Sequence, residues 1–155
     1  MTAESLWPFA LEFYARPGVE AALLELQDAH GHSPPYLIWR LWLASRGVGA
    51  DTAALASAAD LTRAWEQAAV WPLRRMRRRL NAPGPGSPHR REQLRARVQA
   101  LELEAERMLL QMLEERGPSA AVTGDVGVVA CLREAAWAWG GPAPDALLEQ
   151  LAAAL

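Results

Sequence analysis

Residues 61–116 read LTRAWEQAAVWPLRRMRRRL, NAPGPGSP and HRREQLRARVQALELEAERMLLQMLEER in three consecutive parts. The middle part, residues 81–88, holds three Pro and two Gly and cannot continue a helix. Apolar residues recur in the third part at alternating four- and three-residue steps: Leu94, Val98, Leu101, Ala105, Met108 and Met112. Such a heptad stripe is typical of a helix that pairs with an antiparallel neighbour. The segment therefore predicts a long helical hairpin, with helices at about 61–80 and 88–116.

The third helix of the chain is expected to lie in the core. Ser33 and Pro34 suit its N-cap and first helical position, and the helix should end before Gly47. Its sequence, YLIWRLWLASR, is apolar nearly all round, which is typical of a helix that is buried on most sides. Arg40 is the exception, and a buried charge needs a partner. We expect a salt bridge to a neighbouring acid, with a ligand-binding arginine as the alternative.

The remaining segments also favour helices, because Ala and Leu dominate the apolar content and β-branched residues are few. Two short helices are expected before the third, and Asp51 suits the N-cap of an Ala-rich helix ahead of the hairpin. C-terminal helices are expected at 125–139 and 145–155. We therefore predict a single all-α domain over residues 1–155, with six or seven helices and no convincing strand.

Composition indicates a soluble cytoplasmic protein with no membrane partner. The single Cys131 excludes an intrachain disulfide and suits a reducing compartment. The N-terminus carries Glu4 and Glu12 and lacks the basic segment of a secretory signal. The most apolar run, residues 36–44, is interrupted by Arg40 and is far shorter than a bilayer span.

Charge is strongly segregated along the chain. Nine of its sixteen Arg residues fall between positions 74 and 97, although the net charge is only -2. These residues form the arginine cluster: Arg74, Arg75, Arg77, Arg78, Arg79, Arg90, Arg91, Arg95 and Arg97. Because the chain contains no Lys, the use of Arg is not itself a sign of bidentate recognition. The clustering is what raises the question of an anionic partner.

An antiparallel hairpin would place residue 79 near 90 and residue 75 near 94, so that Arg faces Arg. The acids of the second helix would then lie far from the cluster, near Arg63 and Glu66: Glu102, Glu104 and Glu106. The cluster is thus a candidate surface for RNA, DNA or an acidic protein. The alternative is a solvated basic face, or one paired with acids of the N-terminal helices: Glu12, Glu20, Glu25 and Asp28.

Trp71 lies on the flank of its helix near Arg75 and Arg78, where its ring could stack on a base or lie under guanidinium groups. Packing against its neighbours is the alternative. The Trp residues as a set either line a pocket for a flat ligand or fill a core that is short of Ile and Phe.

No cofactor and no metal site is expected. Asp28, His30 and His32 have suitable ligand chemistry, but their spacing straddles a helix end at Gly31 and no further ligands are evident. Cys131 lacks the sequence context of a nucleophile, and no catalytic or phosphate-loop motif is present. These observations argue against an enzyme.

Several motifs resemble a proteobacterial domain-of-unknown-function family of small cytoplasmic helical proteins, over about residues 5–115. They are SLWPFALEFYARPGVEAALLELQDAHG (5–31), Trp42-Leu43-Ala44, Trp65, Pro72-Leu73-Arg74 with Arg77 and Arg78, and LELEAER (101–107). HSPPYLIW (32–39) departs from the family pattern by its double Pro. The resemblance implies an all-helical fold and no known activity.

Three hypotheses on function follow. The first is a non-catalytic interaction or adaptor protein that uses the Arg-rich end of the hairpin to bind another protein. The second is a protein that binds RNA or DNA through the same residues. The third is an enzyme acting on a small ligand near Arg40, for which no catalytic constellation is visible. The sequence predicts no oligomeric state.

Overall fold

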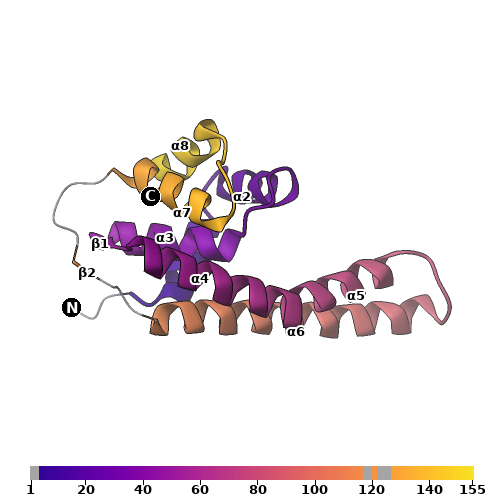
Figure 1. Cartoon of the computed structure of the whole chain (residues 1–155). Coiled ribbons are helices and arrows are strands. Elements are labelled where there is room, and N and C mark those ends of the chain that lie inside the picture. The colour runs from indigo at the N-terminus through magenta and orange to yellow at the C-terminus, as the bar shows by residue number, and fades with distance from the viewer. Residues whose placement is uncertain (1–3, 117–119, 122–126) are drawn as a thin grey trace.

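The computed structural model describes residues 4–116, 120–121 and 127–155. These residues form an all-α fold of seven helices, as predicted, of which the fourth is a composite of three segments (Figure 1). The helices are α1 (Leu6–Tyr14), α2 (Val19–Asp28), α3 (Pro34–Ser45), the composite of α4 (Thr52–Trp65), the π-helix η1 (Glu66–Val70) and α5 (Trp71–Asn81), then α6 (Pro88–Glu115), α7 (Val128–Trp139) and α8 (Asp145–Ala153).

The boundaries of several elements differ from the prediction. A two-residue strand, β1 (Val48–Gly49), pairs antiparallel with β2 (Ala120–Ala121), where the sequence predicted no strand. The helix predicted at 125–139 begins at Val128 in the described residues, and residues 125–126 lie outside them.

Among the described helices, none combines the length and the apolar content needed to span a membrane.

The predicted break between an Ala-rich helix and the helix at 61–80 is wrong, because α4, η1 and α5 run on as one rod. Asp51 caps its start as expected, with a carboxylate oxygen accepting from the Ala54 amide at 2.7 Å. Pro72 lacks an amide hydrogen, and its ring would clash with the carbonyl four residues earlier in a regular helix. The wider π-turn of η1 lies directly before it, so the rod accommodates Pro72 without ending.

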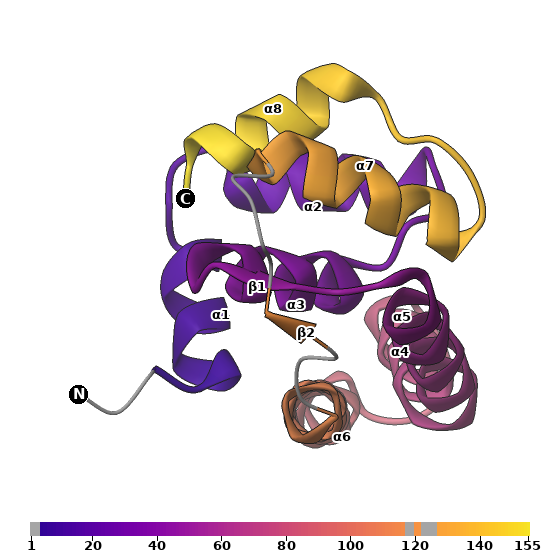
Figure 2. The same cartoon turned by 60° about the vertical axis from the view of Figure 1, so that its left-hand side comes forward.

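The third helix lies at the centre of the fold, as predicted. Figure 2 shows α2, α7 and α8 on one side of α3, and the α4–α5 rod and α6 on the other, with α1 beside it. Its residues from Tyr36 to Leu43 are all buried, and the rings of Tyr36 and Trp39 stack with their centroids 5.9 Å apart. Burial of this apolar helix by surrounding helices is the main source of stability for such a fold.

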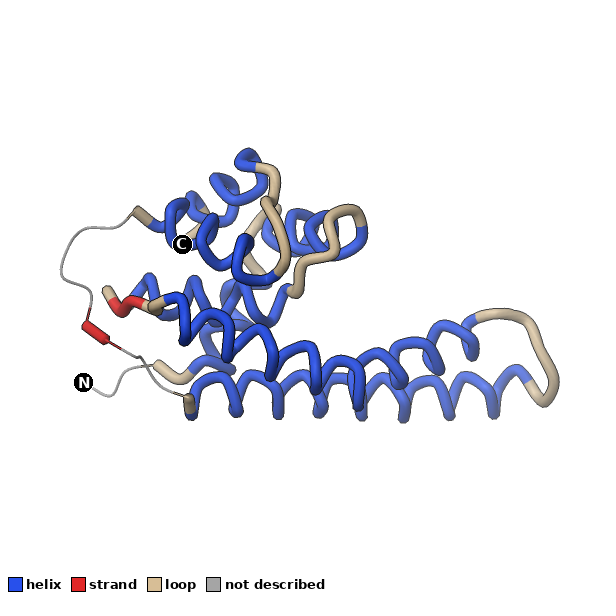
Figure 3. Tube along the Cα trace, viewed as in Figure 1, coloured by secondary structure: helices blue, strands red, loops and turns tan. Residues whose placement is uncertain are grey.

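The hairpin of α5 and α6 forms as predicted and extends well beyond the rest of the molecule (Figures 1 and 3). Its distal half therefore has neighbours only within the hairpin itself. No residue of α5 is fully buried, whereas the proximal part of α6 contributes Leu109 and Leu113 to the core. The arginine cluster extends from the base of this hairpin, where Arg74 contacts Gln27 of α2, toward its projecting end.

Candidate functional site: the arginine-rich hairpin and the hollow at its base

Two members of the arginine cluster are neutralised by acids of α6, contrary to the prediction that these acids lie far away. Arg74 donates from Nε to Glu102 at 3.0 Å and from Nη2 to Glu106 at 3.1 Å. Arg77 donates to Glu102 from Nε at 2.5 Å and from Nη2 at 3.3 Å. The hairpin therefore cancels part of the charge that it was expected to concentrate.

The direction of helical side chains explains this difference. Every side chain in an α-helix leans toward the N-terminus of its own helix. Because α5 and α6 are antiparallel, Arg77 on α5 and Glu102 on α6 lean toward each other and meet, although their backbone positions are offset along the pair. The prediction compared backbone positions alone and so missed these ion pairs.

Glu102 is the buried centre of this network, with a side chain only 8% exposed. Burial alone would raise the pKa of its carboxyl group, but hydrogen bonds from Arg77 and Arg74 hold that pKa below its usual value. Burial raises the pKa of the neighbouring Glu106, because Arg74 compensates only in part. The network joins the two helices at the point where the hairpin leaves the body of the protein.

Two further members of the arginine cluster support the hairpin itself. Arg91 donates to the carbonyl oxygens of Pro85 at 2.8 Å and Ala82 at 2.7 Å, and so holds the 81–88 loop against α6. Arg95 pairs with Glu92 one turn away at 2.7 Å. Both residues therefore have structural partners.

The other five members form no ion pair with any described residue, and all five are exposed. We call them the free arginines: Arg75, Arg78, Arg79, Arg90 and Arg97. The expected alternative, pairing with acids of the N-terminal helices, does not occur among the described residues, since Glu12 pairs with Arg16 and Arg74 reaches Gln27 instead. The cluster thus divides into a paired, structural part and an exposed, unpaired part.

Half of the heptad stripe on α6 is also uncovered. Val98 and Ala105 are buried against the rest of the protein, as a paired helix predicts. The other half remains exposed at 48%, 51% and 44%: Leu94, Leu101 and Met108. These three residues are seven apart and share one face of α6 with the free arginines Arg90 and Arg97. We call this face the apolar stripe.

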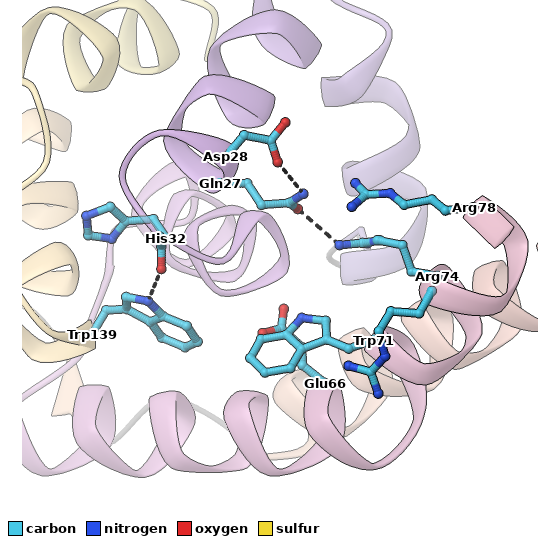
Figure 4. Close-up of a pocket in the computed structure, with 10 residues that line it drawn as sticks. Gln27, Asp28, His32, Glu66, Trp71, Arg74, Arg78 and Trp139 are labelled. Carbon is cyan, nitrogen blue, oxygen red and sulfur yellow. Dashed lines mark hydrogen bonds between the residues drawn. The ribbon is translucent and has the colours of Figure 1, made fainter. Parts of the chain in front are cut away.

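A hollow of about 390 Å³ lies at the base of the hairpin, between α2, η1 and α5. It brings together Trp71, Arg75 and Arg78, the three residues that the sequence placed on one flank of their helix. Trp71 is 36% exposed, so it is not simply a packed core residue. Figure 4 shows its indole ring beside the carboxyl group of Glu66, with Arg74 and Arg78 reaching in from α5.

Glu66 is a feature of this hollow that the sequence did not reveal. It is 6% exposed and accepts a hydrogen bond from the Ser33 hydroxyl at 2.7 Å. Burial raises the pKa of its carboxyl group, with Ser33 and Arg74 opposing the shift in part. Glu66 follows the buried Thr62 by four residues, so it continues the buried face of α4.

The salt bridge expected at Arg40 is not formed with any described residue. Arg40 is 2% exposed, and its Nη1 donates to the Val48 carbonyl of β1 at 3.4 Å. Its Nε has no hydrogen-bond partner in the described part of the chain. The short strand thus supplies a backbone acceptor where the sequence suggested an acid.

Most of the Trp residues serve the core rather than a pocket for a flat ligand. Three indole N–H groups donate to backbone carbonyl oxygens: Trp42 to that of Glu4, Trp65 to that of Ala105 and Trp139 to that of Gly31. Among the candidate metal ligands, His32 is buried while Asp28 and His30 are exposed. No three His, Cys, Asp or Glu side chains gather to hold a metal ion in the described ranges.

The fold and the site define an all-helical protein whose hairpin carries the free arginines and an uncovered apolar stripe. The chain belongs to a family of proteins of unknown function, DUF2390, which matches residues 5–113. This match confirms the resemblance to a family without a known activity. No curated protein and no solved structure matches the chain. The hypotheses on function therefore rest on the side chains themselves.

Proposed function

We propose that the protein is a non-catalytic interaction protein that binds an amphipathic helix with acidic residues on a partner protein. One observation carries this proposal: the apolar stripe lies uncovered on the same face of α6 as Arg90 and Arg97. A face of this kind pairs with a helix that offers apolar residues at heptad spacing. Acidic residues beside the partner's apolar seam would pair with the free arginines and select it against other helices.

The exposed area of the stripe supports the proposal. Single exposed apolar residues are ordinary on protein surfaces, but an aligned set of large ones marks an interaction site. Leu94 lies near the projecting end and Met108 near the body, so the stripe runs along much of α6. We place the protein in the cytoplasm in this proposal, because a chain with the single Cys131 suits a reducing compartment.

Affinity capture with crosslinking from a cell extract, followed by binding measurements on the purified partner, tests this function. We expect crosslinks between α6 and an acidic helix of the partner. Leu101→Ser and Arg97→Glu should each weaken binding at least about tenfold, because both residues lie on this face of α6. Leu103→Ser is the matched control, since Leu103 is 52% exposed on the same helix but on a different face.

Two results would contradict this proposal. Equal weakening by Leu101→Ser and Leu103→Ser would show that the stripe has no special part in binding. A concentration-dependent dimer of the chain itself, abolished by Leu101→Ser, would assign the stripe to self-association instead.

A second candidate function is binding of single-stranded RNA or DNA, supported by the partly exposed Trp71 beside the free arginines Arg75 and Arg78. An exposed indole next to guanidinium groups suits a base and its phosphate. We expect affinity to fall steeply with salt, and Arg75→Ala and Arg78→Ala each to decrease the salt slope by about one, because each removes a phosphate-binding group. Absence of salt-sensitive binding to mixed RNA and DNA pools would reject this candidate.

A further inference from the structure

The hollow at the base of the hairpin is a site separate from the apolar stripe. At about 390 Å³ it falls in the size range of pockets for small molecules. Its walls come from α2, the loop between α2 and α3, η1, α5 and the end of α7. Three chemically different groups converge on it: a buried carboxyl group, a partly exposed indole ring and a pair of free arginines (Figure 4).

The carboxyl group of Glu66 is incompletely used by the protein. Of the described residues, only Ser33 donates a hydrogen bond to it, and the guanidinium of Arg74 is held by Glu102 and Glu106. A buried carboxyl group without a paired cation destabilises a protein. The π-turn that carries it is itself uncommon and occurs often at functional sites. Glu66 therefore retains a free oxygen for a ligand.

Trp71 supplies the flat wall of the hollow. The other indole there, Trp139, is 8% exposed and is covered by Arg63, whose guanidinium carbon lies 4.3 Å from the ring centroid. The 36% exposure of Trp71 leaves ring surface for a ligand. A planar ring bearing an N–H group could stack there and donate to Glu66.

The mouth of the hollow suits an anion. Arg75 and Arg78 follow Trp71 by four and seven residues, which places all three on one side of α5. Neither guanidinium is paired with a described acid, and an arginine fork binds a phosphate through two hydrogen bonds. Asp28 lies on the opposite rim, contributed by α2, so an anionic group is favoured on the α5 side. Burial lowers the pKa of His32, so this residue adds no positive charge.

We propose that this hollow binds a nucleoside monophosphate, either free or at the end of a nucleic-acid strand. The base would stack on Trp71 with an N–H group donating to Glu66, and the phosphate would contact Arg75 and Arg78. The inference does not depend on the docking of a partner helix, because no residue of the apolar stripe lines the hollow.

Titration of the full chain with the four common ribonucleoside 5′-monophosphates tests the proposal, with the Trp71 indole N–H signal followed by NMR. At least one monophosphate should shift this signal, and the matching nucleoside and inorganic phosphate should each bind about tenfold more weakly. Glu66→Gln, which keeps an acceptor for Ser33, should weaken binding by a similar factor. The double variant Arg75→Ala/Arg78→Ala should do the same.

The matched control is Arg90→Ala/Arg97→Ala, which removes two free arginines outside the hollow. Equal loss of binding in both double variants would overturn the proposal, as would a Trp71 signal that no monophosphate moves. Inorganic phosphate binding as tightly as every monophosphate would also overturn it. A strand carrying a terminal phosphate distinguishes the two sources of the ligand. Leu101→Ser should leave nucleotide binding unchanged, so failure of partner docking and failure of this site are distinguishable.

Discussion

At the residue scale, Glu102 decides the state of two arginines at the base of the hairpin. It binds Arg74 and Arg77 together, and its own burial makes it a poor group to leave unpaired. The free arginines lie outside the reach of this carboxylate. Glu102 thus holds two of the four supporting arginines, while Arg91 is held by loop carbonyls and Arg95 by Glu92.

The buried carboxyl group of Glu66 makes stability depend on pH. Burial raises its pKa in the folded protein, so the unfolded chain loses this proton at a lower pH than the folded protein does. The contribution of Glu66 to the free energy of unfolding is therefore fully present below its ordinary pKa of 4.5 and declines as the pH rises through the raised pKa. Glu66→Gln removes this titration, so we expect the variant to lose less stability than the wild type as the pH rises.

Thermal unfolding midpoints of both proteins, measured from about pH 4 to about pH 8, check this expectation. Glu106, which also raises the pKa of Glu66, is present in both proteins. Glu104→Gln, at an exposed position of α6, serves as the control. Parallel curves for the wild type and Glu66→Gln would refute the predicted effect.

Individual residues of the site were only partly predictable. The arginine cluster as a whole and Trp71 stood out because charge clustering and helical spacing are visible in the sequence. The partners of Arg74 and Arg77 did not, because the lean of side chains decides which residues meet across an antiparallel pair. Glu66 carried no signal, since burial of one polar residue depends on the whole fold.

At the scale of elements, α6 carries a heptad pattern that the rest of the described protein covers only in part. Its Val98 and Ala105 half packs within the protein, while its Leu94, Leu101 and Met108 half does not. The pattern predicted a paired helix and was correct for the hairpin. The pattern could not show which of its residues stay exposed, because that depends on the angle at which α5 packs against α6.

The two halves of the pattern should differ in their effect on stability. Leu109 is fully buried and Leu101 is 51% exposed on the same helix. We expect Leu109→Ala to lower the free energy of unfolding by about 2–5 kcal/mol, through reduced burial and the cavity left behind. Leu101→Ala should change it by about 0.5 kcal/mol or less. Urea unfolding of both variants measures the contrast, and equal losses would show that the stripe is already covered in the isolated protein.

At the scale of the whole molecule, the sequence predicts the long, regular elements but not the short, irregular ones. The all-α class, the hairpin and the buried α3 were predictable, because each depends on a long and strongly patterned segment. The continuity of the α4–α5 rod and the β1–β2 pairing were not, since a π-turn and a two-residue strand leave almost no pattern. Neither of these misses altered the overall class.

The projecting hairpin and the enclosed α3 should differ in how readily their helices open locally. The α5 helix has no fully buried residue, whereas α3 is enclosed by helices on several sides. We expect amide hydrogens of residues 75–80 to exchange through local opening of the hairpin, and those of residues 37–43 only through global unfolding. Native-state hydrogen exchange at increasing urea separates the two mechanisms. A common opening free energy for both segments would show that the molecule unfolds as one cooperative unit.

The π-turn between α4 and α5 has a consequence for sequence change in the gene. Each residue of a helix advances the direction of the next side chain by about 100°. Five residues of a π-turn cover about the same angle as four of an α-helix, so loss of a single codon within residues 66–70 would leave α5 facing nearly the same way. It would, however, return Pro72 to a regular helix, where its ring meets the carbonyl oxygen four residues earlier. The same loss within residues 82–86 would shorten an exposed connection and affect at most its hydrogen bonds with Arg91. We therefore expect a deletion at the tip of the hairpin to be tolerated, and a deletion just before Pro72 to kink or weaken the α4–α5 rod.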